Sequence, residues 1–410
     1  MDLSQEVRKL LTSNTTIKSI AVDQNPTEIV FTAPSPGTYD QQWFWDSCLH
    51  SLVWLKLGEK DRAFKELLSL YIGKQQKKLF PHMIFWDYKK TNLIWLLFDR
   101  LYPTNKYSEL IQPPIIGYPL LQLHDEGYEF SKQLIKETLE YYQHLPKCRD
   151  PEKTGLLTIV HPWESGLDSS PKFDLELNST RMFRTKQWMR MRYLLKEFSK
   201  YDWNQKTMAE KSSFRVKCVL TNTLFAWGLE SFIALLRNYN FKDETEELES
   251  LLKTTLLGLI DNCWNEKDGL FYDLNMNKNN GSQIKISTIS SLMPLMLNIP
   301  NDMKNRLISH LTNKDEFWTK FPIPTVSLSE RSFNPNNQYL LWRGPTWVNT
   351  NYFIWLGLNK HKELKLADEI SSKTRQLVEI SGFREFYNPL TGEGEGAKNF
   401  GWSTLISLMK

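Results

Sequence analysis

The sequence is short of the residues that mark several other classes of protein. Its 410 residues include only four cysteines, Cys48, Cys148, Cys218 and Cys263. No two of them form a C-x-x-C pair, so we expect neither a zinc site nor a disulfide framework, and a reducing compartment fits best. The 18 glycines and 19 prolines are few beside a hydrophobic share of 41%, which excludes a collagen-like or broadly disordered chain.

Long apolar runs and blocks of one charge are also lacking. No window reaches the ~18 uninterrupted apolar residues of a membrane span, and the first residues lack the apolar core of a secretory signal. Lysine and arginine number 51 against 47 acidic residues, with the two signs interspersed and a net charge of +4. The sequence therefore predicts a cytoplasmic protein without a membrane or nucleic-acid partner, and it leaves open whether the chain forms a homo-oligomer.

Histidines are few and show no metal-binding spacing. None of the seven belongs to an H-E-x-x-H motif, and we expect His82 and His161 to be hydrogen-bonded core residues. We predict no catalytic metal and no cofactor. Aromatic residues, by contrast, make up 13% of the chain. Large aromatic side chains fill cores, and they also form flat apolar walls against which sugar rings pack.

Helical periodicity dominates the chain, and two classes of helix alternate along it. Six segments are apolar nearly all round, as expected of buried helices: Trp45–Leu57, Gln112–His124, Val216–Asn238, Ile284–Leu297, Thr346–Leu358 and Gly401–Met409. Six are amphipathic or more charged: Leu3–Thr12, Glu59–Lys77, Tyr128–Leu145, Thr245–Cys263, Asp302–Leu311 and His361–Ser381. This alternation predicts an all-α fold, an (α/α)6 toroid with six inner and six outer helices.

No linker interrupts this pattern, so we expect residues 1–410 to form a single domain. Two segments do not belong to the ring. Met182–Lys200 predicts an additional helix in an excursion over about residues 165–214, which we expect to cap one rim of the toroid. Lys90–Tyr102 is apolar but too short for a helix pair. Decoration of the fold is the alternative for both.

The unusual residue clusters all lie where an outer helix leads to the next inner one. If the helices run alternately up and down, these connections share one rim, where they gather tryptophans, carboxylates and amides. The clusters are Gln41–Ser47, Ile111–Ile116, His161–Asp174, Leu340–Asn349 and Phe383–Ser403. Aromatic walls with carboxylates and amides indicate a carbohydrate pocket. Glycosidic cleavage needs two carboxyl groups, and burial beside aromatic residues raises the pKa of the one that acts as an acid.

At these residues the chain resembles the inverting (α/α)6 glycosidases of glycoside hydrolase family 63, especially the bacterial glucosylglycerate and mannosylglycerate hydrolases, and more distantly the family 37 trehalases. The matching blocks are QWFWDS, QPP, ESGLDSSP, WRGPTW, EFYNPLTG and FGWS, in the family's order. The resemblance implies that Asp168 is the general acid and Glu385 the general base. It implies a substrate pocket that includes Trp45, Asp46, Gln112, Trp342 and Arg343. The shared rim adds Trp43, Trp163, Gly166, Trp347 and Trp402 to the expected substrate-binding residues.

Each assignment has a structural alternative. Asp168 and Asp46 suit a turn or a helix N-cap, and Glu164 suits a local structural partner. Glu393 and Glu395 compete with Glu385 but lie in a glycine-rich run that we expect to be flexible and solvated. Arg343 is suited to pinning a carboxylate in place, including that of Glu385.

We expect an inverting, exo-acting hydrolase of an α-linked glucoside or mannoside, with a glycerate-type or short-oligosaccharide substrate. A non-catalytic carbohydrate-binding protein or a sugar epimerase on the same barrel is the alternative. Lys172-Phe173 stands where close relatives carry Arg-Trp. A glycerate carboxylate would need a cation near the pocket mouth, for which the sequence offers Lys172, Lys206, Lys211 and Arg215.

Overall fold

The computed structural model describes residues 3–22, 25–74, 78–86, 107–177, 184–278, 281–336 and 339–410. Six apolar segments form a closed inner ring, in which each segment contacts the next and the last contacts the first. They are α2 (Phe44–Lys56), α5 (Gly117–Asp125), α9 (Val219–Leu236), η6 (Ile289–Met296), α12 (Val348–Lys360) and η7 (Gly401–Ser407). Most residues of these segments other than α5 are buried, which explains why their sequences lack a polar face.

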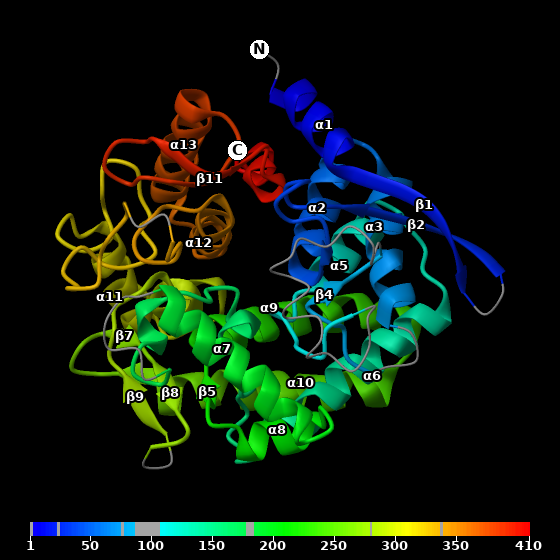
Figure 1. Ribbon diagram of the computed structural model, residues 1–410, viewed down its shortest axis with the longest axis horizontal. Helices are drawn as coiled ribbons and strands as arrows, with labels where there is room; N and C mark the ends of the chain where they lie inside the picture. The colour runs from blue at the N-terminus through cyan, green and yellow to red at the C-terminus, as the bar shows by residue number, and fades with distance from the viewer. Residues whose placement is uncertain are drawn as a thin grey trace.

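Six amphipathic helices surround the ring. They are α1 (Leu3–Asn14), α3 (Lys60–Lys74), α6 (Lys132–Arg149), α10 (Lys242–Gly258), α11 (Asn301–Thr312) and α13 (Leu364–Ser381). The chain passes once around the molecule, so α1 packs against η7 and the two ends of the chain lie near each other (Figure 1). The predicted (α/α)6 toroid is confirmed.

Several inner segments differ from the predicted helices in length or type. α5 starts at Gly117, five residues after the predicted start, because Pro113 and Pro114 disfavour the helical conformation of the residue that precedes each of them. The fourth and sixth inner segments, η6 and η7, are 3-10 helices, and η6 contains Pro294. α9 begins at Val219 because Val216–Lys217 pairs as the short strand β5 with β8 (Asp273–Asn275).

A long hairpin precedes the first inner helix, and the prediction did not include it. β1 (Thr15–Val22) pairs with β2 (Asn25–Thr32) in antiparallel register, with Thr15 opposite Thr32. The last four residues of β2 are all buried, so the strand does not show the alternation by which a half-buried strand is recognised. The remaining strands are short: β3 (Gln42–Trp43), β4 (Met83–Ile84), β6 (Trp264–Asn265), β7 (Leu270–Phe271), β9 (Ser282–Ile284), β10 (Arg384–Tyr387) and β11 (Gly394–Lys398).

The predicted additional helix is present as α7 (Arg184–Ser199), followed by α8 (Gln205–Lys211). Short 3-10 turns, η2 (Pro162–Ser165) and η3 (Pro171–Phe173), precede them. The predicted segment Lys90–Tyr102 lies outside the described residues. Among the described residues, one helical stretch, Val219–Tyr239, is long and apolar enough to cross a membrane, but 89% of its apolar 18-residue window is buried inside the fold, as expected of a core helix.

Candidate active site

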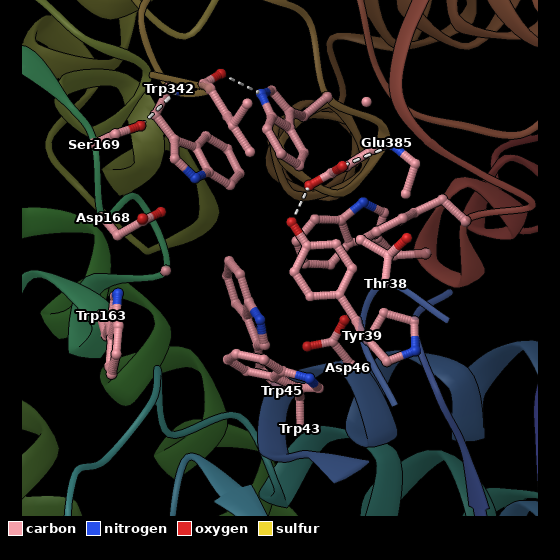
Figure 2. A pocket seen from close by; sticks show the side chains of 18 of the residues that line it. Thr38, Tyr39, Trp43, Trp45, Asp46, Trp163, Asp168, Ser169, Trp342 and Glu385 are labelled. Carbon is pink, nitrogen blue, oxygen red and sulfur yellow. Dashed lines mark hydrogen bonds between the residues drawn. The ribbon is translucent and has the colours of Figure 1, made fainter. Parts of the chain in front are cut away.

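One rim of the toroid contains a cavity of about 490 Å³. Its walls come from the five clusters that the sequence placed on one rim, which confirms that these outer-to-inner connections converge. Eleven of the twelve predicted site residues line it: Trp43, Trp45, Asp46, Gln112, Trp163, Gly166, Asp168, Trp342, Trp347, Glu385 and Trp402. Helix α7 contributes to the same wall. Figure 2 shows the Asp168 and Glu385 carboxyl groups pointing into the cavity from opposite sides.

Asp168 lies in the turn that follows η2, on the wall formed by the excursion. Burial raises the pKa of its carboxyl group from 3.8 to about 6. The Trp342 indole and the backbone N–H groups of Asp168 and Ser169 favour the ionised form and hold the pKa below what burial alone would give. A carboxyl group with this pKa retains its proton well above the usual range of an aspartate, which is the property required of a general acid.

Glu385 lies on β10 and faces the cavity from the other side. The Tyr39 hydroxyl donates to its Oε1 at 2.8 Å, and the Ala397 backbone N–H donates to its Oε2 at 2.8 Å. The pKa of Glu385 is raised to about 6: burial is the largest cause, the nearby Asp168 charge adds to it, and the two donors oppose both effects. Two donors that favour the ionised form suit a carboxylate that accepts a proton from water.

The hairpin of β10 and β11 depends on a glycine at position 396. A Cβ atom there would lie 2.5 Å from Glu385 Oε2, and the backbone has φ +67°, a conformation that favours glycine. The expectation that the run from Glu393 to Lys398 is flexible was wrong, because Gly394–Lys398 forms β11 and pairs with β10. Glu393 is exposed and Glu395 is half-buried, and neither lines the cavity.

Tryptophan rings form much of the cavity wall. Trp342 stacks on Trp347 with the ring centroids 3.7 Å apart and the planes 9° from parallel. Trp402 stands edge-on to Trp45 at 5.4 Å. Gly166 lets its loop approach Trp45 closely, since a Cβ atom there would lie 2.4 Å from the indole ring. These rings provide flat apolar faces next to the carboxyl groups.

Asp46 and Gln112 bring polar groups to the floor of the cavity. Asp46 lies in the first turn of α2, whose N-cap residue is Trp43, so the alternative N-cap role for Asp46 is wrong. Its Oδ1 is buried without a hydrogen-bond partner among the described residues, and burial raises the pKa of the carboxyl group well above its usual range. Gln112 Oε1 accepts from the Trp45 backbone N–H at 3.0 Å and so ties the second cluster to α2. An unsatisfied buried carboxylate oxygen in a cavity is suited to a sugar hydroxyl.

Glu164 and His161 lie behind the wall and are structural. Glu164 accepts from both terminal nitrogens of Arg149, at 3.0 and 2.7 Å, and from the backbone N–H groups of Ile111 and Val160. His161 Nδ1 accepts from the Trp163 backbone N–H at 3.2 Å, and burial lowers the pKa of His161 to about 3. No group of three potential metal ligands occurs in the described residues.

The structure corrects the predicted position of Arg343. Its guanidinium is buried and does not line the cavity; it binds Asp174 through both terminal nitrogens, so it pins a carboxylate, but not that of Glu385. The cations considered for a glycerate also lie elsewhere. Lys172 is buried and forms an ion pair with Asp273 at 2.7 Å. No lysine or arginine is found among the described residues that line the cavity, so Lys206, Lys211 and Arg215 do not line it either.

Several lining residues were missed by the sequence analysis. Tyr39 lies two residues before the first cluster, and its contact with Glu385 spans 346 residues. Gln187, Trp188 and Met191 follow an i, i+1, i+4 pattern on one face of α7, which is the signal that would have pointed to them. Tyr339 also lines the cavity.

A closed (α/α)6 ring with two buried carboxyl groups in an aromatic cavity defines the class of the protein: it is a glycoside hydrolase. A model of the "Mannosylglycerate hydrolase MGH1-like glycoside hydrolase domain" matches residues 39–403, and the chain belongs to this family. Mannosylglycerate hydrolase of Thermus thermophilus is 28% identical over 96% of this chain and 99% of its own length. Glucosylglycerate hydrolase of Mycolicibacterium hassiacum is 22% identical over 92% of this chain and 93% of its own.

The solved structures agree with this assignment. The glycoside hydrolase family 63 mannosylglycerate hydrolase from Thermus thermophilus, in complex with Tris and D-glycerate, superposes with a TM-score of 0.86 at 25% identity, covering 99% of both chains. A second crystal structure of that enzyme contains glucose. The neutral trehalase from Saccharomyces cerevisiae, with a TM-score of 0.59 at 15% identity over 98% of this chain and 79% of its own, shares the fold. The resemblance predicted from the sequence is confirmed.

Proposed function

We propose that this glycoside hydrolase removes one α-linked mannosyl or glucosyl unit from a small glycoside with inversion at the anomeric carbon. The observation that carries the proposal is the pair of carboxyl groups, Asp168 and Glu385, which face each other across one cavity (Figure 2). Asp168 donates its proton to the departing glycosidic oxygen while the bond from the anomeric carbon to that oxygen breaks. Glu385 takes a proton from the water whose oxygen bonds to the opposite face of the same carbon.

The cleaved sugar occupies the floor of the cavity, next to Trp45 and Asp46. The unpartnered Asp46 oxygen accepts a sugar hydroxyl, and the tryptophan walls exclude bulk water so that these hydrogen bonds act in a medium of low polarity. The cavity volume of about 490 Å³ suits one sugar with a small aglycone, which supports exo-action. Glycerate is the first aglycone to test, because two of the relatives are named for mannosylglycerate and glucosylglycerate hydrolysis.

The test is a panel of α-linked substrates incubated with the purified protein: mannosylglycerate, glucosylglycerate, trehalose and short gluco-oligosaccharides. The anomer of the released sugar is followed directly by NMR during the first minutes. We expect turnover of at least one of these glycosides, with the β-anomer appearing first. Initial release of the α-anomer would show retention and contradict the roles given to the two carboxyl groups. A tight complex with an unreacted glycoside would instead identify a binding protein.

A further inference from the structure

We propose that the ion pair between Asp174 and Arg343 is a positioning device for the general acid, acting on Asp168 through Trp342. The proposal rests on the function proposed for Asp168. Residues 168–174 and 342–343 form the two segments concerned. The ion pair joins Asp174 to Arg343, which are 169 residues apart in the sequence. Neither segment contains a strand or an α-helix, so each depends on side-chain contacts for its position.

Three contacts join the two segments. The Trp342 indole lies next to the Asp168 carboxyl group and lowers its pKa, and both residues line the cavity. The Trp342 backbone N–H donates to Ser169 Oγ at 3.1 Å (Figure 2). Arg343 donates from Nη1 to Asp174 Oδ2 at 2.7 Å and from Nη2 to Asp174 Oδ1, which is a bidentate arrangement. The first two contacts involve cavity-lining residues, whereas the ion pair lies behind the wall.

The ion pair fixes the relative position of the segments more firmly than the other two contacts. Arg343 is 1% exposed, and a planar guanidinium bound through two nitrogens permits little rotation or sliding of its partner. Asp174 terminates η3, and consecutive turns connect it back to Asp168: Ser170 N–H donates to Leu167 O at 2.9 Å. A shift of Asp174 therefore moves the turn that carries the general acid.

The consequence concerns proton donation rather than sugar binding. Misplacement of a catalytic group by about 1 Å costs about 100-fold in rate. If the ion pair aims the Asp168 carboxyl group at the departing oxygen, its loss slows substrates whose aglycone needs that proton. Loss of the ion pair leaves the rate nearly unchanged for substrates whose aglycone departs unaided. A dinitrophenyl glycoside is such a substrate, because its stable phenolate needs no protonation. Loss of general structure would slow both kinds of substrate together.

The experiment compares Asp174→Asn with Asp168→Asn and with a matched control, Glu152→Gln. Glu152 resembles Asp174 in being a partly exposed acid, with 24% of its side chain exposed against 22%. It is paired with a buried cation, Lys217, at 3.0 Å, and also with Arg215. kcat and KM are measured for the natural-type glycoside found by the substrate panel and for the dinitrophenyl glycoside of the same sugar. Thermal unfolding is recorded for every variant.

We expect Asp174→Asn to lower kcat at least tenfold on the alkyl glycoside and less than threefold on the dinitrophenyl glycoside, with KM nearly unchanged. A variant Arg343→Lys, which retains the charge but loses the bidentate geometry, should show the same selectivity in weaker form. Glu152→Gln should lose stability without any selectivity between the substrates. Equal losses on both substrates in Asp174→Asn would overturn the positioning role. If Asp168→Asn itself shows no selectivity, the proposed function fails and not only this inference.

Discussion

Asp168 and Glu385 share a raised pKa of about 6 but are held by different kinds of structure. Glu385 lies on a hairpin, and one of its donors, Ala397, is only 12 residues away on the paired strand. Asp168 lies in a run of turns whose donor, Trp342, comes from a segment more than 170 residues distant. Burial raises both pKa values to a similar level, so the pKa of a carboxyl group does not indicate which contacts hold it in position.

One cavity thus has two kinds of wall. The β10–β11 hairpin forms the Glu385 wall through local backbone pairing, and the turns of residues 168–174 form the Asp168 wall, which depends on contacts with distant residues. A strand pair fixes its side chains through backbone hydrogen bonds that any suitable sequence can form. A run of turns needs specific partners, here Trp342 and the Arg343 ion pair with Asp174. We therefore expect the Glu385 wall to respond to changes that disturb the backbone, and the Asp168 wall to respond to changes in remote side chains.

The largest expected effect separates the two roles. Glu385→Gln should lower kcat by about 1,000-fold or more on every substrate, because water must always be deprotonated. Asp168→Asn should cause a comparable loss on alkyl glycosides but only a small one on a dinitrophenyl glycoside. Steady-state rates on the two substrate types measure this difference. If both variants respond identically to the leaving group, the division into acid and base is wrong.

A backbone change should break the Glu385 wall. Gly396→Ala puts a methyl group 2.5 Å from Glu385 Oε2 in a backbone conformation with φ +67°, so the carboxylate or the strand must move. We expect kcat to fall about 100-fold with a small change in KM. Gly392→Ala is the control, since it has φ +82° in the same hairpin but meets Phe321 instead of the carboxylate. A similar loss of activity in both variants would indicate hairpin strain rather than displacement of Glu385.

The alternation of apolar and amphipathic segments was sufficient to predict the toroid, because helices buried on all sides need no polar face. The type of each helix and the positions of the strands depend on local backbone conformation and could not be predicted in the same way. The fourth inner segment is a 3-10 helix that contains Pro294, and β2 was missed because its buried residues are consecutive rather than alternate. The shared rim could be predicted because inner and outer helices alternate in direction, which places every outer-to-inner connection at the same end of the toroid.

Partners within the site could not be predicted in the same way. Tyr39 and Glu385 are 346 residues apart, and Arg343 and Asp174 are 169 apart, and a single sequence contains no signal of such pairings. Gly396 belongs to a glycine-rich run with the composition of a flexible loop, although a close approach to Glu385 is what requires it. Arg343 was therefore predicted correctly as a carboxylate partner but incorrectly as a cavity residue.

A side-chain change should affect the Glu385 wall more mildly. Tyr39→Phe removes the hydroxyl that donates to Glu385 Oε1 and thereby favours its ionised form. Without this donor the pKa of Glu385 rises, and the acidic limb of the pH profile of kcat/KM moves to higher pH. We expect an activity optimum near pH 6 in the unaltered protein and about a tenfold lower kcat in the variant. An acidic limb that stays in place would show that Tyr39 does not tune the base.

The smallest effect concerns stability. Burial raises the pKa of Asp168 from 3.8 to about 6, so the native state favours the protonated form. Well below pH 4 the carboxyl group is neutral in both the folded and the unfolded chain, and the penalty is absent. As the pH rises through 6 the native state must ionise a buried group, which costs about 3 kcal/mol. Asp168→Asn removes this cost and should raise Tm by about 3 °C at pH 8.

The pH dependence distinguishes this cause from a general stabilising effect of the substitution. The difference in Tm between Asp168→Asn and the unaltered protein should shrink steadily as the pH falls from about 6 towards 4, because the folded chain then takes up the proton that the unfolded chain binds only near the usual aspartate pKa. Asp315→Asn, which changes an exposed carboxylate after α11, should leave Tm unchanged across the same range. A constant increase in Tm at every pH would show that the asparagine side chain simply packs better at this position and that ionisation of the general acid does not burden the fold.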